Sequence, residues 1–452
     1  MSSSRLSHPV TILGVGLATI GAVLFLIVFA LDLFGFHTNP YIGILFFLVL
    51  PAVFLAGLAL VPLGIWLNRR RAQSGRAPAR WPAIDLNDAT TRRTVLGTAV
   101  LTLVNIVIVS LAAYRGVEYM DSVAFCGQVC HEVMEPEFVA YQDGPHSRVT
   151  CVQCHIGPGA PWFVKSKLSG TRQVFAVLLN SHSRPIASPV SDLRPARDTC
   201  EQCHWPEKFH GDKVEVRREY AADEANTESV TTLRIHVGGG SEKLGVASGI
   251  HWHMNVANRI EYVATDDKRQ TIPWVRLTDR QGRAREFRVS DVTDEVLARG
   301  ERRVMDCMDC HNRPSHPFDP SPGRAVDAAI ALGDISRELP FIRRESVAAL
   351  TERFDSRGAA VTRIAERLRG FYAKNYPAVV ASRSVALERA IARTQALYQR
   401  NVFPAMNVWW GTYVNNVGHS SGPGCFRCHD DNHKSKDGAV IRQDCDLCHT
   451  IE

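Results

Sequence analysis

Cys151-Val-Gln-Cys154-His155 is the stretch that decides how this chain folds, because its pattern is repeated. Two cysteines followed directly by a histidine recur with the same spacing at Cys200–His204, Cys307–His311, Cys425–His429 and Cys445–His449. A variant with one more residue between the cysteines, Cys126-Gly-Gln-Val-Cys130-His131, precedes them. Together the six motifs use all 12 cysteines of the 452-residue chain.

The CxxCH pattern is typical of covalent haem c attachment. The two thiols bond to the haem vinyl groups, and the histidine reaches the iron from the same short turn. A CxxC pair alone also serves zinc sites, redox dithiols and disulfides, but none of these requires a histidine after every pair. We therefore predict six covalently bound haem c groups and their iron. The attachment residues are Cys126, Cys130, Cys151, Cys154, Cys200, Cys203, Cys307, Cys310, Cys425, Cys428, Cys445 and Cys448, and the motif ligands are His131, His155, His204, His311, His429 and His449.

Histidines outside the motifs are numerous enough to supply the sixth iron ligand. Bis-histidine ligation gives lower potentials than methionine–histidine ligation. For any single histidine, a surface position or a contact with a haem propionate is the alternative. After the first motif, Met134 either ligates the first iron or packs against the porphyrin ring. The candidate histidines are His146, His182, His210, His251, His253, His316, His419 and His433.

Three apolar runs, at 10–33, 41–67 and 94–114, are each long enough to cross a bilayer. The first is too long for a signal peptide and lacks a convincing cleavage site, so we predict an anchor. Seven arginines lie between the second and third runs and none between the first two, which predicts a cytoplasmic loop there. The protein is then multi-pass in a bacterial inner membrane, with its C-terminal haem domain on the periplasmic face. Three glycines in the first run predict close helix packing: Gly14, Gly16 and Gly21.

The long spacers between motifs differ in pattern. The first contains strand-like runs at 213–220, 231–237, 259–265, 272–278 and 284–289, and the second has helical spacings at 325–338, 344–354, 359–372 and 382–399. We predict an α+β fold with three N-terminal transmembrane helices. A haem-dominated domain of low secondary-structure content follows, with porphyrins replacing much of the apolar core. The predicted divisions are a two-helix membrane segment at 10–67, a helix with a three-haem domain at 94–204, a β-rich insert at 205–306, and a three-haem domain with a helical spacer at 307–452.

Residues 94–204 resemble the NapC/NirT/NrfH family of membrane-anchored, quinol-oxidising multihaem cytochromes. The similarity is carried by Thr94–Tyr114, Cys126–Met134, His146–His155 and Trp162–Gly170. The remainder is similar to the larger inner-membrane members, with six or seven haems, of metal-respiring bacteria. Those stretches are Cys203–Pro206, Gly249–His253, Cys310–His316, Asn407–Tyr413 and Pro423–Cys425.

The resemblance implies oxidation of menaquinol and electron transfer to periplasmic cytochromes or a reductase, in anaerobic or extracellular respiration. This is an activity like that of a quinol:cytochrome c reductase. Met134 matches the family's axial methionine, and Lys165 or Lys167 matches its lysine near the quinol. The family's carboxylate after the second haem has no counterpart, so the candidates for that role are Asp121, Glu132, Glu135 and Asp143.

Two other functions stay open. One is a terminal multihaem reductase of a nitrogen oxyanion, which needs an iron open to substrate. The other is an electron-transfer subunit of a larger membrane complex, whose partner subunits dock on the two extra helices within the lipid. Nucleic acid is not an expected partner, because the propionates of six haems outweigh the formal charge of +6.

Overall fold

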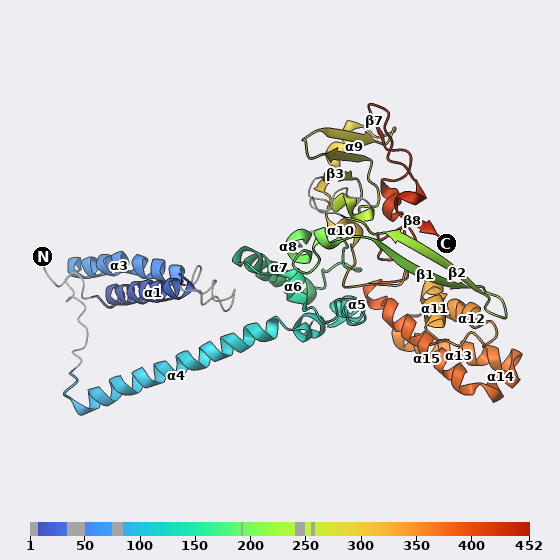
Figure 1. The fold of residues 1–452 in the computed structure, drawn as a ribbon. Coiled ribbons are helices and arrows are strands. Elements are labelled where there is room, and N and C mark those ends of the chain that lie inside the picture. The colour runs from blue at the N-terminus through green and yellow to red at the C-terminus, as the bar shows by residue number, and fades with distance from the viewer. Residues whose placement is uncertain are drawn as a thin grey trace. The chain divides into compact units, whose positions relative to one another are not determined.

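The computed structural model describes residues 8–33, 50–74, 85–129, 131–190, 193–239, 249–254 and 258–452. The chain divides into two compact units. The first comprises Met1–Met120 and Ile156–Gly170, and the second comprises Asp121–His155 and Thr171–Glu452. Figure 1 labels the helices and strands along the chain. Helices and antiparallel sheets are both present, so the predicted mixed class is confirmed.

The first unit contains three long helices, α1 (Pro9–Leu33), α3 (Leu50–Gln73) and α4 (Ala89–Met120). One stretch of the described residues, Ala52–Arg71, is long and apolar enough by length and composition to cross a membrane, and Pro9–Leu24 is a shorter apolar helix. The predicted start of the second run, at 41–49, lies outside the described residues.

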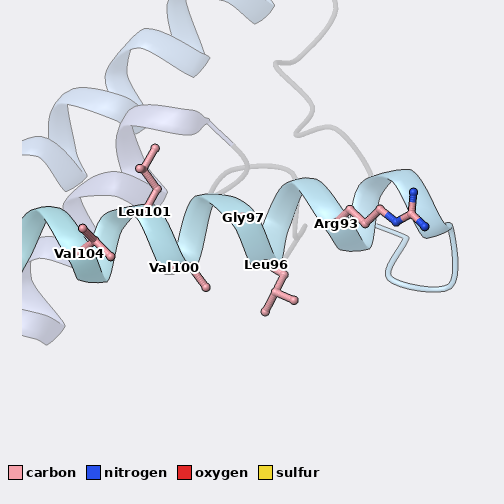
Figure 2. Close-up of a pocket in the computed structure, with 6 residues that line it drawn as sticks. All are labelled: Arg93, Leu96, Gly97, Val100, Leu101 and Val104. Atoms are coloured by element: carbon pink, nitrogen blue, oxygen red, sulfur yellow. The ribbon is translucent and has the colours of Figure 1, made fainter.

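The surface of α4 is apolar along its N-terminal half. Figure 2 shows the side chains of Leu96, Val100, Leu101 and Val104 projecting from this helix, with Arg93 nearer its start. Leu96 and Leu101 are 64% and 63% exposed within the structure. This much exposed apolar surface on one helix is typical of a surface that contacts another protein or a membrane.

Glycines allow α1 and α3 to approach each other closely. A Cβ built on Gly14 would lie 2.7 Å from the carbonyl oxygen of Gly57, and one on Gly57 would lie 2.5 Å from the amide nitrogen of Ala18. Gly21 also lies against the backbone of α3. The predicted close packing is therefore confirmed at Gly14 and Gly21. It is wrong for Gly16, which is on another face of the helix and has no described residue within 4 Å of its Cβ position.

Two antiparallel sheets are built mainly from the predicted insert. One has the strand order β1-β2-β8 and the other β6-β3-β4-β5-β7. All five predicted strand runs form strands. The C-terminal segment adds one short strand to each sheet, so the last two motifs are attached to the insert. The bounds are β1 Asp212–Tyr220, β2 Glu228–His236, β3 Arg259–Ala264, β4 Trp274–Thr278, β5 Ala284–Arg288, β6 Glu301–Val304, β7 Lys434–Ser435 and β8 His449–Ile451.

A helical module follows the fourth motif. Its helices are α11 (Pro322–Ala331), α12 (Ile342–Thr351), α13 (Arg357–Asn375), α14 (Pro377–Ser382) and α15 (Ser384–Asn401). They share an apolar core in which Ile342, Leu350, Leu368 and Tyr398 are fully buried. The predicted helical runs are confirmed. The expectation that porphyrins replace much of the apolar core does not hold for this module, because its amphipathic faces bury one another.

Short helices carry or flank the motifs. They are η3 (Phe125–Val129), α5 (His131–Gln142), α6 (Cys151–His155), α7 (Ala160–Leu178), α8 (Ala196–Cys200), η4 (Pro206–Lys208), η5 (Ile250–Met254), α9 (Asp294–Arg299), α10 (Cys307–Cys310), η6 (Pro404–Met406), η7 (Gly424–Arg427) and η8 (Cys445–Leu447).

Candidate functional site

Each regular motif forms a single tight turn. The second motif is the helix α6 itself. In the third, fourth and fifth motifs the amides of His204, His311 and His429 donate to the carbonyl of their own motif's first cysteine, at 2.8, 2.8 and 3.0 Å. In the last motif the Cys448 amide donates to the Cys445 carbonyl at 3.1 Å. Such a turn holds two cysteines beside one histidine, as attachment to one porphyrin requires.

The first motif takes a different turn that suits its extra residue. η3, at Phe125–Val129, is a π-helix, and a π-turn closes its hydrogen bond one residue later than an α-turn. Gly127 is buried within it, and a Cβ there would collide with the ring of Phe138. Cys130 and the side chain of His131 lie outside the described part of the chain.

Five histidines outside the motifs each face a motif histidine. Metal–imidazole bonds of about 2.0–2.1 Å on both sides of one iron put the two ring centroids roughly 6 Å apart. All five pairs have this separation, so each regular motif presents two imidazoles that fit one iron between them. The centroid distances are 6.3 Å for His155–His316, 6.0 Å for His204–His146, 6.3 Å for His311–His251, 5.9 Å for His429–His253 and 6.1 Å for His449–His419.

Hydrogen bonds orient most of these partner histidines. A carbonyl oxygen can only accept, so a ring nitrogen bound to one carries the proton and leaves the other nitrogen free to ligate a metal. Four partner histidines have Nδ1 at such an oxygen. The distances are 3.1 Å from His146 to Pro314, 3.0 Å from His251 to Val237, 2.8 Å from His253 to Ile250 and 2.8 Å from His316 to Glu137.

Desolvation by the surrounding chain lowers the pKa of several of these imidazoles. It is the largest cause of the lowered pKa of His155, His253, His311 and His316. For His316 the nearby Glu137 carboxylate acts in the opposite direction. A neutral imidazole is the form that binds a metal, so the electrostatics and the geometry of these pairs agree.

Comparison with known proteins identifies this arrangement. Residues 89–186 match the N-terminal region of the NapC/NirT cytochrome c family. The whole chain is 42% identical, over 454 aligned residues, to the cytochrome c-type protein ImcH of Geobacter sulfurreducens, and the alignment covers 100% of this chain and 89% of that protein. The chain belongs to the NapC/NirT cytochrome c family. No solved structure matches it significantly.

Membership of the NapC/NirT family makes the chain a membrane multihaem cytochrome with covalently bound haem c. The observed turns fit that group, because their cysteines and histidines are the donors that it needs. At each regular motif the two cysteines would hold the porphyrin and the paired histidines would hold the iron.

Three predicted ligands of this NapC/NirT cytochrome do not face a motif histidine in the described structure. His433 has Nδ1 at 2.8 Å from an Asp430 carboxylate oxygen and Nε2 at 2.6 Å from the Ile272 carbonyl. Both ring nitrogens are hydrogen-bonded, so neither is available to a metal in this arrangement. Nearness to a motif suggested a ligand, but here this histidine bonds to Asp430 in its own loop and to the segment just before β4. His210 is exposed, with Nδ1 at the Lys208 carbonyl. His182 has two buried ring nitrogens and no hydrogen-bond partner among the described residues.

The residues predicted for quinol lie in different units. Met134 is half-buried on α5, one turn after position 131, in the second unit. Lys165 and Lys167 are on the part of α7 that belongs to the first unit. Their ammonium groups lie over aromatic rings, Lys165 at 5.1 Å from the Trp162 centroid and Lys167 at 4.8 Å from that of Phe163. Both lysines are thus held near apolar rings of their own helix.

Two of the candidate carboxylates have structural partners. Glu135 forms an ion pair with Arg357, and Asp143 lies 3.5 Å from Arg400. Both pairs join the segment after the first motif to the helical module. The role of a carboxylate near the quinol stays a prediction for all four residues.

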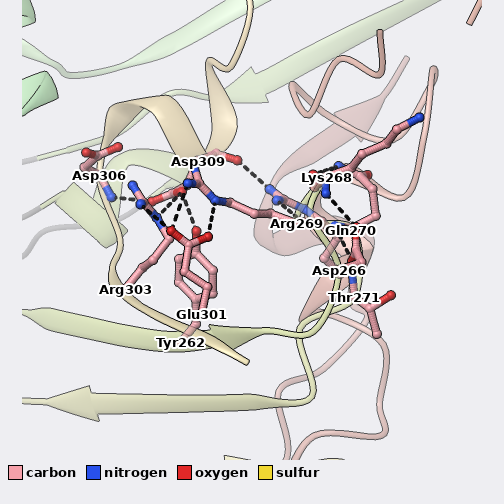
Figure 3. A network of polar contacts seen from close by, with 11 residues as sticks. Tyr262, Asp266, Lys268, Arg269, Gln270, Thr271, Glu301, Arg303, Asp306 and Asp309 are labelled. Carbon is pink, nitrogen blue, oxygen red and sulfur yellow. Dashed lines mark hydrogen bonds and ion pairs between the residues drawn. The ribbon is translucent and has the colours of Figure 1, made fainter. Parts of the chain in front are cut away.

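A buried polar network, which the sequence analysis missed, holds the fourth motif (Figure 3). Asp306 and Asp309 form a capping box around α10. Asp309 also accepts a hydrogen bond from the Tyr262 hydroxyl at 2.5 Å, and burial with this carboxylate raises the pKa of Tyr262. Arg427, inside the fifth motif, donates to the Asp309 carbonyl at 2.6 Å. The Asp-x-x-Asp spacing is the signal that could have identified the cap.

Proposed function

We propose that this cytochrome holds six haem c groups, oxidises menaquinol at the periplasmic side of the inner membrane and passes electrons to periplasmic acceptors in anaerobic or extracellular respiration. The supporting observation is the set of five opposed histidine pairs. Five irons with two imidazoles each have no open position for a substrate, so they suit electron transfer. Haem c supplies the one-electron chemistry when it is bound.

The first motif is the proposed place of quinol oxidation. It follows α4 closely in the sequence, because α4 ends at Met120 and η3 starts at Phe125. It differs from the other motifs in its π-turn and in the methionine that follows it. In this proposal Met134 is an alternative iron ligand, and Lys165 or Lys167 places a cation beside the quinol head group, where it favours the anion formed on deprotonation.

Membrane anchoring through three helices is part of the proposal. The exposed apolar side chains of α4 suit contact with lipid. At the C-terminal end of α3, Arg70 stacks over Trp66 at 4.3 Å, and such aromatic and basic residues are enriched at membrane interfaces. Arginines at the end of α3 and the start of α4 favour a cytoplasmic connection, which directs the second unit to the periplasm.

The alternatives are distinguished by the same pairs. A terminal reductase of a nitrogen oxyanion needs an open iron, and five motifs have none in this arrangement. A role as a subunit of a larger membrane complex is compatible with the proposal, because α1 and α3 pack together and offer a further helical surface. Of the three functions, we therefore favour that of an electron carrier from quinol to the periplasm.

Reconstituted protein tests the proposal. The purified cytochrome should contain six haems by pyridine haemochrome assay. When it is reconstituted in lipid vesicles and mixed with a reduced menaquinone analogue, its haems should become reduced. Lys165→Ala and Lys167→Ala together should slow this reduction about tenfold, as expected when a charge-assisted hydrogen bond is lost. Lys374→Ala, in the last turn of α13, is the matched control and should leave the rate unchanged. A wild-type protein that is not reduced by the quinol would overturn the proposal.

A further inference from the structure

The cysteines of consecutive motifs lie against one another in the second unit. The side chain of Cys126 in the first motif hydrogen-bonds with that of Cys151 in the second. The side chain of Cys200 in the third motif does the same with Cys307 in the fourth. Each contact joins motifs that are neighbours in the sequence, although more than a hundred residues separate Cys200 from Cys307.

Electrostatic interactions indicate that the cysteines of the remaining consecutive motifs are also near one another. Cys154 and Cys203 are close enough to interact electrostatically, which joins the second motif to the third. Cys310 interacts in the same way with Cys425, joining the fourth to the fifth. Cys425 interacts with Cys448, joining the fifth to the sixth. Each pair of consecutive motifs therefore has two cysteines that are either hydrogen-bonded or near enough to interact electrostatically.

The partner histidines support the later steps independently. His251 and His253 both lie on η5, yet one faces the fourth motif's histidine and the other faces the fifth's. His419 lies just before Cys425 in the sequence but faces His449 of the sixth motif. A short segment thus spans two neighbouring motifs in each case. Helices α8 and α10 are also in contact, which places the third motif beside the fourth.

We infer that the six haem attachment sites form a single row in the order of the sequence, with the first and sixth motifs at its ends. The inference rests on the proposed function in one respect, that all six motifs carry haem. Each cysteine bonds to the edge of its porphyrin, so cysteines in contact bring the edges of consecutive porphyrins together. At the far end Cys445 is exposed and Leu447 is 44% exposed, so this end of the row is open to a soluble acceptor.

Removing one attachment site tests the order. In the double variant Cys307→Ser/Cys310→Ser the fourth site is missing, and the row predicts that a reduced menaquinone analogue reduces only the haems of the first three motifs. Dithionite, which is small and reaches every haem, should reduce all that remain. The matched control Cys445→Ser/Cys448→Ser removes the terminal site, and here the quinol analogue should reduce every remaining haem. Full reduction of the first variant by the quinol would reveal a path around the fourth site and overturn the row.

A second measurement does not depend on a variant that folds. Iron positions in a cryo-electron microscopy map of the wild-type holoprotein should show each iron nearest to those of the preceding and following motifs. A nearest neighbour from a non-consecutive motif would overturn the inference. This readout also separates the two proposals. Wild-type protein that has six haems in this order but is not reduced by quinol would contradict the proposed function and leave the row intact.

Discussion

At each partner histidine, one hydrogen bond decides which ring nitrogen is available to a metal. In His146, His251 and His316 a carbonyl oxygen accepts a hydrogen bond from Nδ1, which leaves Nε2 available to a metal. In His433 both nitrogens are already bound. A sequence cannot distinguish these cases, because the carbonyls that make the difference come from distant segments. The cysteines and motif histidines were predictable because their chemistry depends only on local spacing.

Replacing one partner histidine should change one haem. In His316→Ala the iron of the second motif loses its facing imidazole, so one haem should convert from low spin to high spin. Low-temperature electron paramagnetic resonance, with absorbance near the high-spin charge-transfer band, measures the change. His210→Ala is the control, because His210 is exposed and faces no motif histidine in the described structure. Equal spectra for the two variants would contradict the assignment.

Acid should weaken the fold through the same histidines, whose pKa is lowered in the folded state. Desolvation lowers the pKa of His155, His253, His311 and His316 in the folded state. In the unfolded chain a histidine has a pKa of about 6.5. The unfolded state therefore binds more protons below that pH, and the free energy of unfolding should fall as the pH drops from about 6.5 to 5. Denaturant midpoints at several pH values measure this. A constant or rising free energy over that range would contradict it.

At the scale of elements, some helices and strands could be predicted from local sequence patterns, whereas others form only through pairing with distant segments. The alternating runs of β1–β5 and the three–four spacings of α11, α12, α13 and α15 were sufficient to predict those elements, whereas α14 was not predicted. β7 and β8 were not predictable, since strands of two and three residues carry no periodicity and exist only through pairing with β5 and β2. The π-turn of the first motif was also missed, although its extra residue is visible in the sequence.

The π-turn makes a specific demand at Gly127. In Gly127→Ala the new methyl group would collide with the ring of Phe138, and forced overpacking of this kind costs about 1–3 kcal/mol. We expect a lower melting temperature and partial loss of the first haem, measured by circular dichroism and haem content. Gly370→Ala is the matched control, because no atom of the described part of the chain lies within 4 Å of its Cβ position on α13. It should be neutral or stabilising by up to about 1 kcal/mol. A more stable Gly127→Ala would contradict the packing.

At the scale of the whole molecule, two kinds of core support the chain. The helical module has a continuous apolar interior, and the five-stranded sheet has a smaller one around Tyr262. The motifs lie on short turns between these regions, where covalent and metal bonds take the place of apolar burial. Composition alone did not reveal this division, because the average over the chain hides where the apolar residues are concentrated.

The membrane arrangement gives a prediction for the whole chain. Alkaline phosphatase fused after residue 124 should be active, because that point is predicted to be periplasmic, and the same enzyme fused after residue 74 should be inactive. Green fluorescent protein at the two positions should show the opposite pattern. The expectation follows from the arginines at the end of α3 and the start of α4. Activity of the phosphatase at position 74 would contradict it.

The pairing of His155 with His316 also constrains biogenesis. The second motif leaves the ribosome early, yet its facing imidazole is synthesised only after the fourth motif. During translocation, the second site therefore lacks its facing histidine until the segment that contains His316 has been synthesised. A nascent chain that stalls before His316 has no facing histidine for its second site, and such a fragment is a natural target for quality-control proteases.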